Sequence, residues 1–244
     1  MIRLVAADFT KVRTVKIGWI FLAIVLGLTA LFASLAVGLH KGSYDSQEIR
    51  DLFSISGSFL VPVFVLLLGI FGFTTEFRHG TIAETFLVTP RRERVLAAKL
   101  IAYALVGFAF ALLAAAVMVA IELPWLNADG VDVSLSDPPI RGLLLGGLVG
   151  GALWGAIGVA VGGAVRNQVG AVIGTLVWLL IVENILTGFF PDEAGLLPGR
   201  AGDALSGPGT GQVLTREEGA LMLLAWLAAT VLVAGLLLRR RDVT

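Results

Sequence analysis

Long uncharged stretches divide the chain. Five of them contain no Asp, Glu, Lys, Arg or His: Ile17–Leu39, Leu52–Thr75, Leu100–Ile121, Gly142–Val165 and Gly219–Leu238. A helix rises about 1.5 Å per residue, so roughly 20 residues cross a bilayer core of about 30 Å. Each stretch is therefore long enough to form a membrane-spanning helix.

A sixth stretch is interrupted by one acid. Asn167–Val182 is uncharged, Glu183 follows, and Asn184–Pro191 is again uncharged. Counted through Glu183, this segment also reaches across a bilayer. Backbone groups in lipid must be satisfied within the protein, and the alternation of a barrel strand is missing, so the spans are expected to be helical. The predicted fold is one all-α integral membrane domain over residues 1–244, with six spans near residues 17–39, 52–75, 100–122, 140–165, 168–187 and 217–238.

Composition supports the membrane class and excludes several kinds of site. The chain is 57% hydrophobic with a mean hydropathy of +0.92, more apolar surface than a soluble domain of this size can bury. It has no cysteine, which excludes disulfides, thiolate metal sites and cysteine nucleophiles. Its two histidines, His40 and His79, fall in different loops, so no metal site is expected. The expected surroundings are a lipid bilayer and protein partners, not nucleic acid.

The basic residues predict which way the chain crosses the membrane. If it begins in the cytoplasm and crosses six times, thirteen of its 18 Lys and Arg residues lie on the cytoplasmic side. The other five are Lys41, Arg50, Arg141, Arg200 and Arg216. An excess of Lys and Arg marks the cytoplasmic side of membrane proteins. Both termini and the loop Glu76–Lys99 are therefore expected to be cytoplasmic.

The loop Glu76–Lys99 carries its own helix signals. Thr81-Ile-Ala-Glu84 matches the S/T-x-x-E capping box, and Gly80 permits a tight turn before it. Pro90 ends whatever helix begins there. The predicted helix has about two turns, which is too short to be stable alone in water. It must therefore dock on something.

The spacing within this short helix leaves its docking site open. Ile82, Phe86 and Leu87 place apolar groups on one side. A short amphipathic helix of this kind suits insertion into a groove on a soluble partner. It also suits a helix that rests on lipid headgroups, with the neighbouring arginines serving only to fix the topology.

Two other segments carry helix signals near the membrane boundaries. Thr215-Arg-Glu-Glu218 matches a capping box that would open the sixth span. Apolar residues recur at three- and four-residue spacing over residues 2–12, with basic residues between them. They predict either a short helix flat on the inner membrane surface or an amphipathic start of the first span.

The segment Glu76–Lys99 resembles a known family. Its pattern, E-x-R-x-G-T-I-x-E-T-x-L-x-T-P-R-R-E-R-x-x-x-A-K, is similar to the first cytoplasmic loop of ABC-2 type transporter permeases, especially those of high-GC Gram-positive bacteria. Lys11-Val-Arg13 resembles the family's basic N-terminal helix. Leu196-Leu-Pro198, after a span that carries a glutamate, also resembles the family pattern. The resemblance extends over the whole chain, but only the loop motif is specific.

The resemblance implies a permease subunit in a bacterial plasma membrane, without an ATPase of its own. No lysine follows a glycine in the chain, so a phosphate-binding P-loop is absent. ATP and Mg would be bound by a separate ATP-binding cassette subunit, present in two copies, and a second permease chain would complete a homodimer or heterodimer. Gly80–Val88 would be the coupling helix. The implied coupling residues are Glu76, Arg78, His79, Gly80, Thr81, Ile82, Glu84, Thr85, Phe86, Pro90, Arg91 and Arg92.

Glycines dominate the fourth predicted span. Gly142, Gly146, Gly150, Gly158 and Gly162 share a four-residue ladder. Small residues at this spacing let helix backbones approach closely. We expect tight packing inside one subunit rather than a dimer seam.

Polar groups inside the spans are candidates for a substrate path or for helix breaks. Pro62 removes a helix hydrogen bond and tends to kink the second span. A glutamate within a span is a candidate functional residue, although Glu183 lies near the outer interface and can also cap a break in the fifth span. The residues concerned are Ser54, Ser56, Ser58, Pro62, Glu183 and Asn184.

Two kinds of transporter remain possible at this stage. The first is the membrane subunit of an ATP-driven exporter, with a hydrophobic or amphipathic cargo such as a drug, antibiotic, lipid or peptide. The second is an ion-gradient-driven transporter with Glu183 as the coupling acid, although no internal repeat is apparent. An intramembrane enzyme is the least favoured class, because neither H-E-x-x-H nor G-x-S-x-G occurs.

Overall fold

A computed structural model describes residues 1–39, 48–49, 52–53, 60–207 and 214–240. Within these ranges the regular elements are helices, and no strand occurs. They are α1 (Ile2–Thr14), α2 (Lys16–Leu39), α4 (Leu60–Arg78), α5 (Ile82–Val88), α6 (Arg92–Ala128), α7 (Pro138–Val165), α8 (Gln168–Val177), the π-helix η1 (Trp178–Val182), α9 (Glu183–Phe189), the 3₁₀-helix η2 (Ala194–Leu196), α10 (Pro198–Ser206) and α11 (Arg216–Arg240).

Six helices are long and apolar enough to cross a membrane, which confirms the predicted fold class. They are Lys16–Leu39, Leu60–Arg78, Arg92–Ala128, Pro138–Val165, Gln168–Phe189 and Arg216–Arg240. The third is much longer than the predicted span 100–122, because one helix of 37 residues includes the basic segment after Pro90 and also continues to Ala128.

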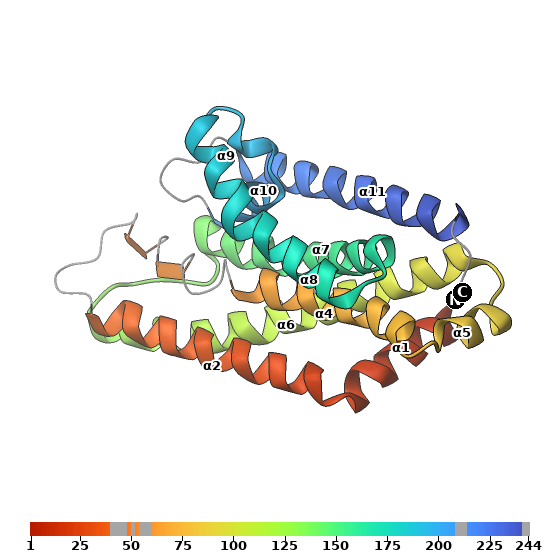
Figure 1. The fold of residues 1–244 in the computed structure, drawn as a ribbon. Helices are drawn as coiled ribbons and strands as arrows, with labels where there is room; N and C mark the ends of the chain where they lie inside the picture. The colour runs from red at the N-terminus through yellow and green to blue at the C-terminus, as the bar shows by residue number, and fades with distance from the viewer. Residues whose placement is uncertain (40–47, 50–51, 54–59, 208–213, 241–244) are drawn as a thin grey trace.

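Helix α7 lies at the centre of the bundle and packs against α4, α6, α10 and α11 (Figure 1). Its glycines make these contacts possible. A Cβ at Gly155 would overlap the carbonyl oxygen of Tyr103 in α6, and one at Gly158 would overlap that of Leu66 in α4. These two glycines therefore pack inside one chain, as expected. Gly147, in contrast, has open space where a Cβ would stand.

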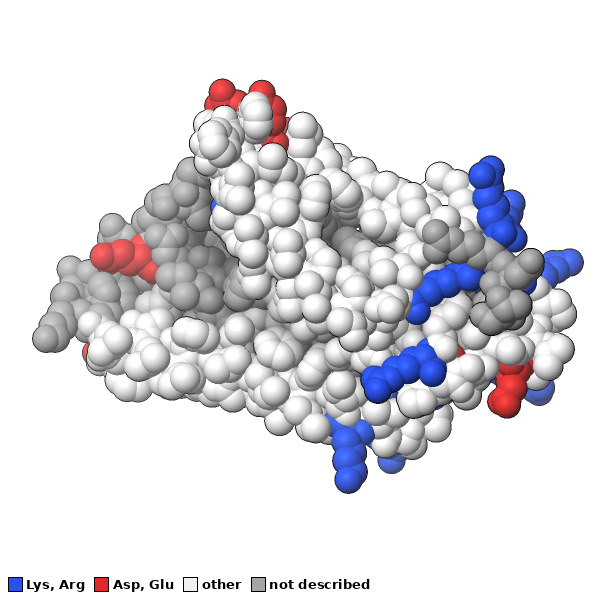
Figure 2. All heavy atoms as spheres, in the orientation of Figure 1, with Lys and Arg blue, Asp and Glu red and all other residues white. Residues whose placement is uncertain are grey.

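The N-terminal segment forms a helix separate from the first span. Val15 has φ −85° and ψ 125°, an extended conformation that interrupts the helix between α1 and α2. Figure 1 shows α1 at the end of the bundle that also holds α5 and the last turn of α11. Lys and Arg side chains gather at this same end in Figure 2. We call it the basic end.

The fifth span changes helix type and then turns back on itself. The π-helix η1 separates α8 from α9, and a turn with η2 leads into α10. Helix α10 returns to pack against α7 and α11. The segment after Phe189 therefore re-enters the bundle.

Candidate functional site

The loop at the basic end contains the predicted short helix, but not the predicted capping box. Gly80 has φ +72°, a left-handed conformation that glycine adopts without strain and that provides the tight turn. Thr81 is already helical, with φ −72° and ψ −10°, and its side chain makes no capping hydrogen bond. A capping hydroxyl needs an extended backbone at its own residue to reach the N–H groups of the first turn, so Thr81 cannot act as a side-chain cap of α5.

The two sides of α5 have different surroundings. Ile82 is buried, and Phe86 packs against the core of the chain. Leu87 and Val88 are 82% and 84% exposed. The three apolar residues predicted to share one side of α5 therefore have different roles. Ile82 and Phe86 anchor α5 to its own chain, whereas Leu87 stays exposed. The surface left uncovered at the end of α5 is formed by Leu87 and Val88.

Next to α5, a buried ion cluster joins three helices. Lys99 in α6 is 1% exposed. Its Nζ donates to Asp8 Oδ1 of α1 at 2.8 Å and to Glu76 Oε1 of α4 at 2.7 Å. It also donates to the carbonyl of Gly72 at 3.1 Å. Lys11 Nζ reaches the same Glu76 oxygen at 2.6 Å. The sequence resemblance made Glu76 a flanking contact of the coupling helix, but here it is 5% exposed and ties α1, α4 and α6 together.

A cavity of about 290 Å³ lies between this ion cluster and α5. Asp8, Lys11, Glu76 and Lys99 line one part of it, and Glu84 of α5 lines another. Glu84 thus belongs to the cavity rather than to a capping box.

Two arginines bind the last carbonyls of the sixth span, Arg92 from the start of α6 and Arg166 from the end of α7. Arg92 Nη1 donates to the carbonyl of Leu238 at 2.6 Å, and its guanidinium lies 5.3 Å from the centre of the Phe86 ring. Arg166 Nη2 donates to the carbonyl of Leu237 at 3.0 Å. Cations at a helix C-terminus stabilise its unpaired carbonyls. Arg92 therefore bridges α5 and α11 within the chain.

The remaining predicted loop residues lie on the surface. Arg78, whose Nη1 is 3.4 Å from Gln168 Oε1, is exposed. Pro90 and Arg91 are also exposed, and Thr85 is half-buried. His79 and Thr81 are exposed on the turn that precedes α5. These residues surround α5 without forming a closed site of their own.

Glu183 and Asn184 lie near the opposite end, against α10. Both carboxylate oxygens of Glu183 accept from the backbone N–H of Gly199, at 3.2 and 2.9 Å. Glu183 therefore caps the first turn of the re-entrant helix α10. Arg200 Nη2 donates to Asn184 Oδ1 at 3.3 Å. Pro62 lines the same cavity as this pair, whereas Ser54, Ser56 and Ser58 lie outside the described residues.

Reasoning from sequence did not identify Asp8 and Lys99 as partners. The available signal was modest: Asp8 is an acid inside a basic amphipathic segment, and Lys99 directly precedes a long uncharged stretch. In the part of the chain that the structure describes, no group of three metal-ligating side chains occurs.

Comparison with known proteins links this architecture to a family. Residues 4–182 match the family model described as ABC-2 family transporter protein. The matched range includes most of α1, the ion cluster and α5, and ends just before Glu183. No curated protein matches the chain.

Proposed function

Since the chain belongs to the ABC-2 family of transporter proteins, we propose that it is the membrane subunit of an ATP-driven exporter. ATP and Mg²⁺ are bound by a separate ATP-binding subunit, and this chain performs no catalysis. Its apolar spans favour a hydrophobic or amphipathic cargo. The termini and α5 face the cytoplasm of a bacterium, in keeping with the basic residues at that end.

The observation that carries the proposal is the combination of a firmly anchored α5 with an uncovered apolar tip. Ile82 and Phe86 hold α5 on the bundle, and the ion cluster fixes the helices beneath it. Leu87 and Val88 are more than four-fifths exposed at a surface rich in basic residues. Exposed apolar residues within a polar rim are typical of a protein contact. The ATP-binding subunit is the partner we assign to this contact.

In this proposal, two membrane chains and two ATP-binding subunits form the transporter. The second membrane chain is either an identical copy or a homologue. ATP binding draws the two α5 helices together and biases the membrane helices between two arrangements. Arg92 extends this connection to α11, because it contacts both Phe86 and Leu238.

The geometry of Glu183 disfavours the alternative of ion-gradient coupling. A coupling acid must exchange protons or ions during transport. Glu183 instead uses both oxygens to hold the backbone N–H of Gly199. This arrangement is typical of a structural cap.

A paired substitution tests the contact with the ATP-binding subunit. Leu87→Ser combined with Val88→Ser should abolish co-purification of that subunit, together with transport, while the chain still inserts into the membrane. Leu135→Ser is the control, because Leu135 is also exposed but lies in the loop between α6 and α7. If the double variant retained both the ATP-binding subunit and transport, α5 would not be the contact.

A further inference from the structure

Two neighbouring cavities lie on the side of the bundle formed by α8–α11. The first, which we call the apolar cavity, has a volume of about 300 Å³ and lies among α4, α7, α8, η1 and α11. The second, the polar cavity, has a volume of about 190 Å³ and lies between the fifth span and α10. Trp154 and Leu179 line both cavities. The two volumes therefore adjoin at these side chains.

The apolar cavity has the length and lining of a site for an alkyl chain. Its wall is mostly aliphatic and aromatic, and includes Ile157, Trp178 and Trp226. Along the fifth span the lining runs from Gly170 to Trp178, about 12 Å at the helical rise. An acyl chain in this cavity makes dispersion contacts with the side chains that line it, and these contacts stabilise the bundle. All its walls except Pro198 come from helices able to span the membrane, where acyl chains are the neighbouring molecules.

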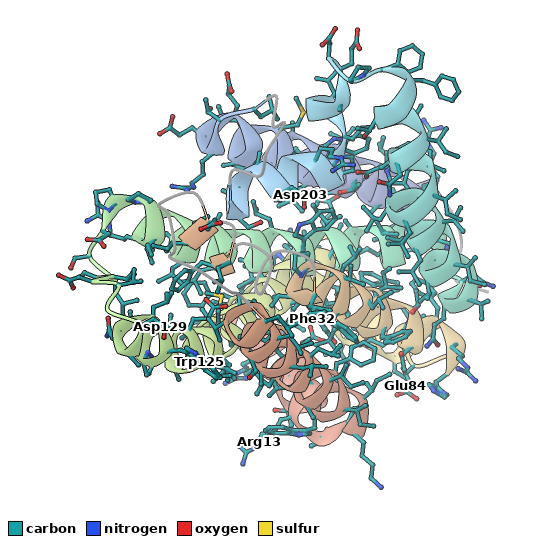
Figure 3. All side chains as sticks on the ribbon, turned by 90° about the vertical axis from the view of Figure 1, so that its left-hand side faces the viewer. Arg13, Phe32, Glu84, Trp125, Asp129 and Asp203 are labelled. Atoms are coloured by element: carbon teal, nitrogen blue, oxygen red, sulfur yellow. The ribbon has the colours of Figure 1, made fainter. Side chains whose placement is uncertain are left out.

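The polar cavity is lined by one cation, Arg200, and two acids, Asp203 and Glu183. The Glu183 carboxylate already accepts from the backbone N–H of Gly199, which leaves Arg200 and Asp203 as the pair of opposite charges for a ligand. Arg200 Nη1 lies 3.6 Å from Asp203 Oδ2, and their side chains are 40% and 46% exposed. Burial raises the pKa of the Asp203 carboxyl, and the Arg200 guanidinium acts in the opposite direction. Figure 3 shows Asp203 on the side of α8–α11, away from Phe32 of α2. A guanidinium beside a carboxylate is complementary to a head that joins a phosphate to an ammonium group.

The fifth span is irregular where the two cavities meet. Residues Trp178–Val182 form a π-helix, and Trp178 and Leu179 within it line the apolar cavity. Such π-helical turns occur frequently at functional sites.

We propose that the two cavities together bind one phospholipid with a zwitterionic ammonium–phosphate head. One acyl chain occupies the apolar cavity. The phosphate contacts Arg200 and the ammonium contacts Asp203. This site does not depend on the ATP-binding subunit, so its test is independent of the test of the proposed function.

Native mass spectrometry of the purified full chain tests the site. The protein is taken from bilayers of equal phosphatidylethanolamine and phosphatidylglycerol, and the retained lipid is identified. The wild type should retain one phosphatidylethanolamine per chain. Gly174→Phe should lose it, because Gly174 lines the apolar cavity and its Cβ position is open. Gly188→Phe is the matched control, since Gly188 lies in the same span, has equal space and lines neither cavity.

The head is tested by two charge variants. Asp203→Asn should reduce the preference for phosphatidylethanolamine over phosphatidylglycerol by about tenfold, the loss expected for one charge-assisted hydrogen bond. Arg200→Gln should instead reduce the retention of both lipids by about the same factor, because both carry the phosphate. If Gly174→Phe and Gly188→Phe retained equal amounts of lipid, the apolar cavity would not be the acyl-chain site. A wild type that retains no lipid would overturn the whole proposal, and one that retains both lipids equally would overturn the assignment of the head group.

Discussion

Replacement of Lys99 by methionine is the sharpest test of how the basic end is built. Methionine keeps the length and apolar stem of the side chain, so the change removes the ammonium group with little change in packing. Three hydrogen bonds are lost, to Asp8, Glu76 and the carbonyl of Gly72. Two buried carboxylates then face each other without the cation between them.

The expected cost follows from burial. Removing one partner of a buried ion pair costs about 3–5 kcal/mol, because the remaining charge stays desolvated. Lys11 still reaches Glu76 at 2.6 Å, and its side chain is 51% exposed, so part of the compensation remains. We therefore expect the lower figure, about 3 kcal/mol, which is about a hundredfold in the folding equilibrium.

Unfolding of the purified chain in detergent micelles measures this loss. Arg94→Met on the same helix is the control, because Arg94 is exposed and should change stability little. Limited trypsin digestion provides a local measurement, since loss of the cluster should release α1 and expose Lys11 and Arg13 to cleavage. Adding Asp8→Asn and Glu76→Gln to Lys99→Met should restore most of the stability, because no unpaired buried charge is then left.

Two results would refute this reasoning. One is a Lys99→Met variant as stable as Arg94→Met, which would mean that the cluster contributes nothing. The other is a triple variant no more stable than Lys99→Met, which would mean that lost packing, not uncompensated charge, caused the damage.

Three further predictions concern helix contacts and caps. Gly155→Ala should lower the free energy of unfolding by about 1–3 kcal/mol or more, because its methyl group would overlap a facing carbonyl, whereas Gly147→Ala should not. If the two variants unfolded alike, the close packing at Gly155 would be contradicted. Glu183→Gln should preserve transport in vesicles, because the amide oxygen still accepts from the α10 backbone, while Glu183→Ala should lower stability; loss of transport in the Gln variant alone would favour a coupling acid. Thr215→Ala should lower the free energy of unfolding by about 1 kcal/mol and Thr81→Ala by much less, because of these two threonines Thr215 alone forms a capping box. Equal losses in the two variants would contradict this assignment of the capping box.

Much of the fold is determined by local sequence. The five uncharged stretches and the sixth one, which Glu183 interrupts, correspond to six long helices, because a chain in lipid must satisfy its backbone within each segment. Gly80 and Pro90 bound the short helix α5 as predicted, since their effects on the backbone are local. The glycine spacing in α7 indicated close packing, and the contacts of Gly155 and Gly158 lie inside the chain.

The tertiary structure decided what each polar or amphipathic residue does. Two S/T-x-x-E patterns occur, and only Thr215–Glu218 forms a capping box, because the turn at Gly80 leaves Thr81 already helical. Asp8 and Lys99 are 91 residues apart in sequence, so no local pattern could pair them. Glu183 became the cap of α10 only because the chain turns back after Phe189. Local sequence determines which segments are helical and apolar, whereas partners far apart in the chain are set by how the helices pack.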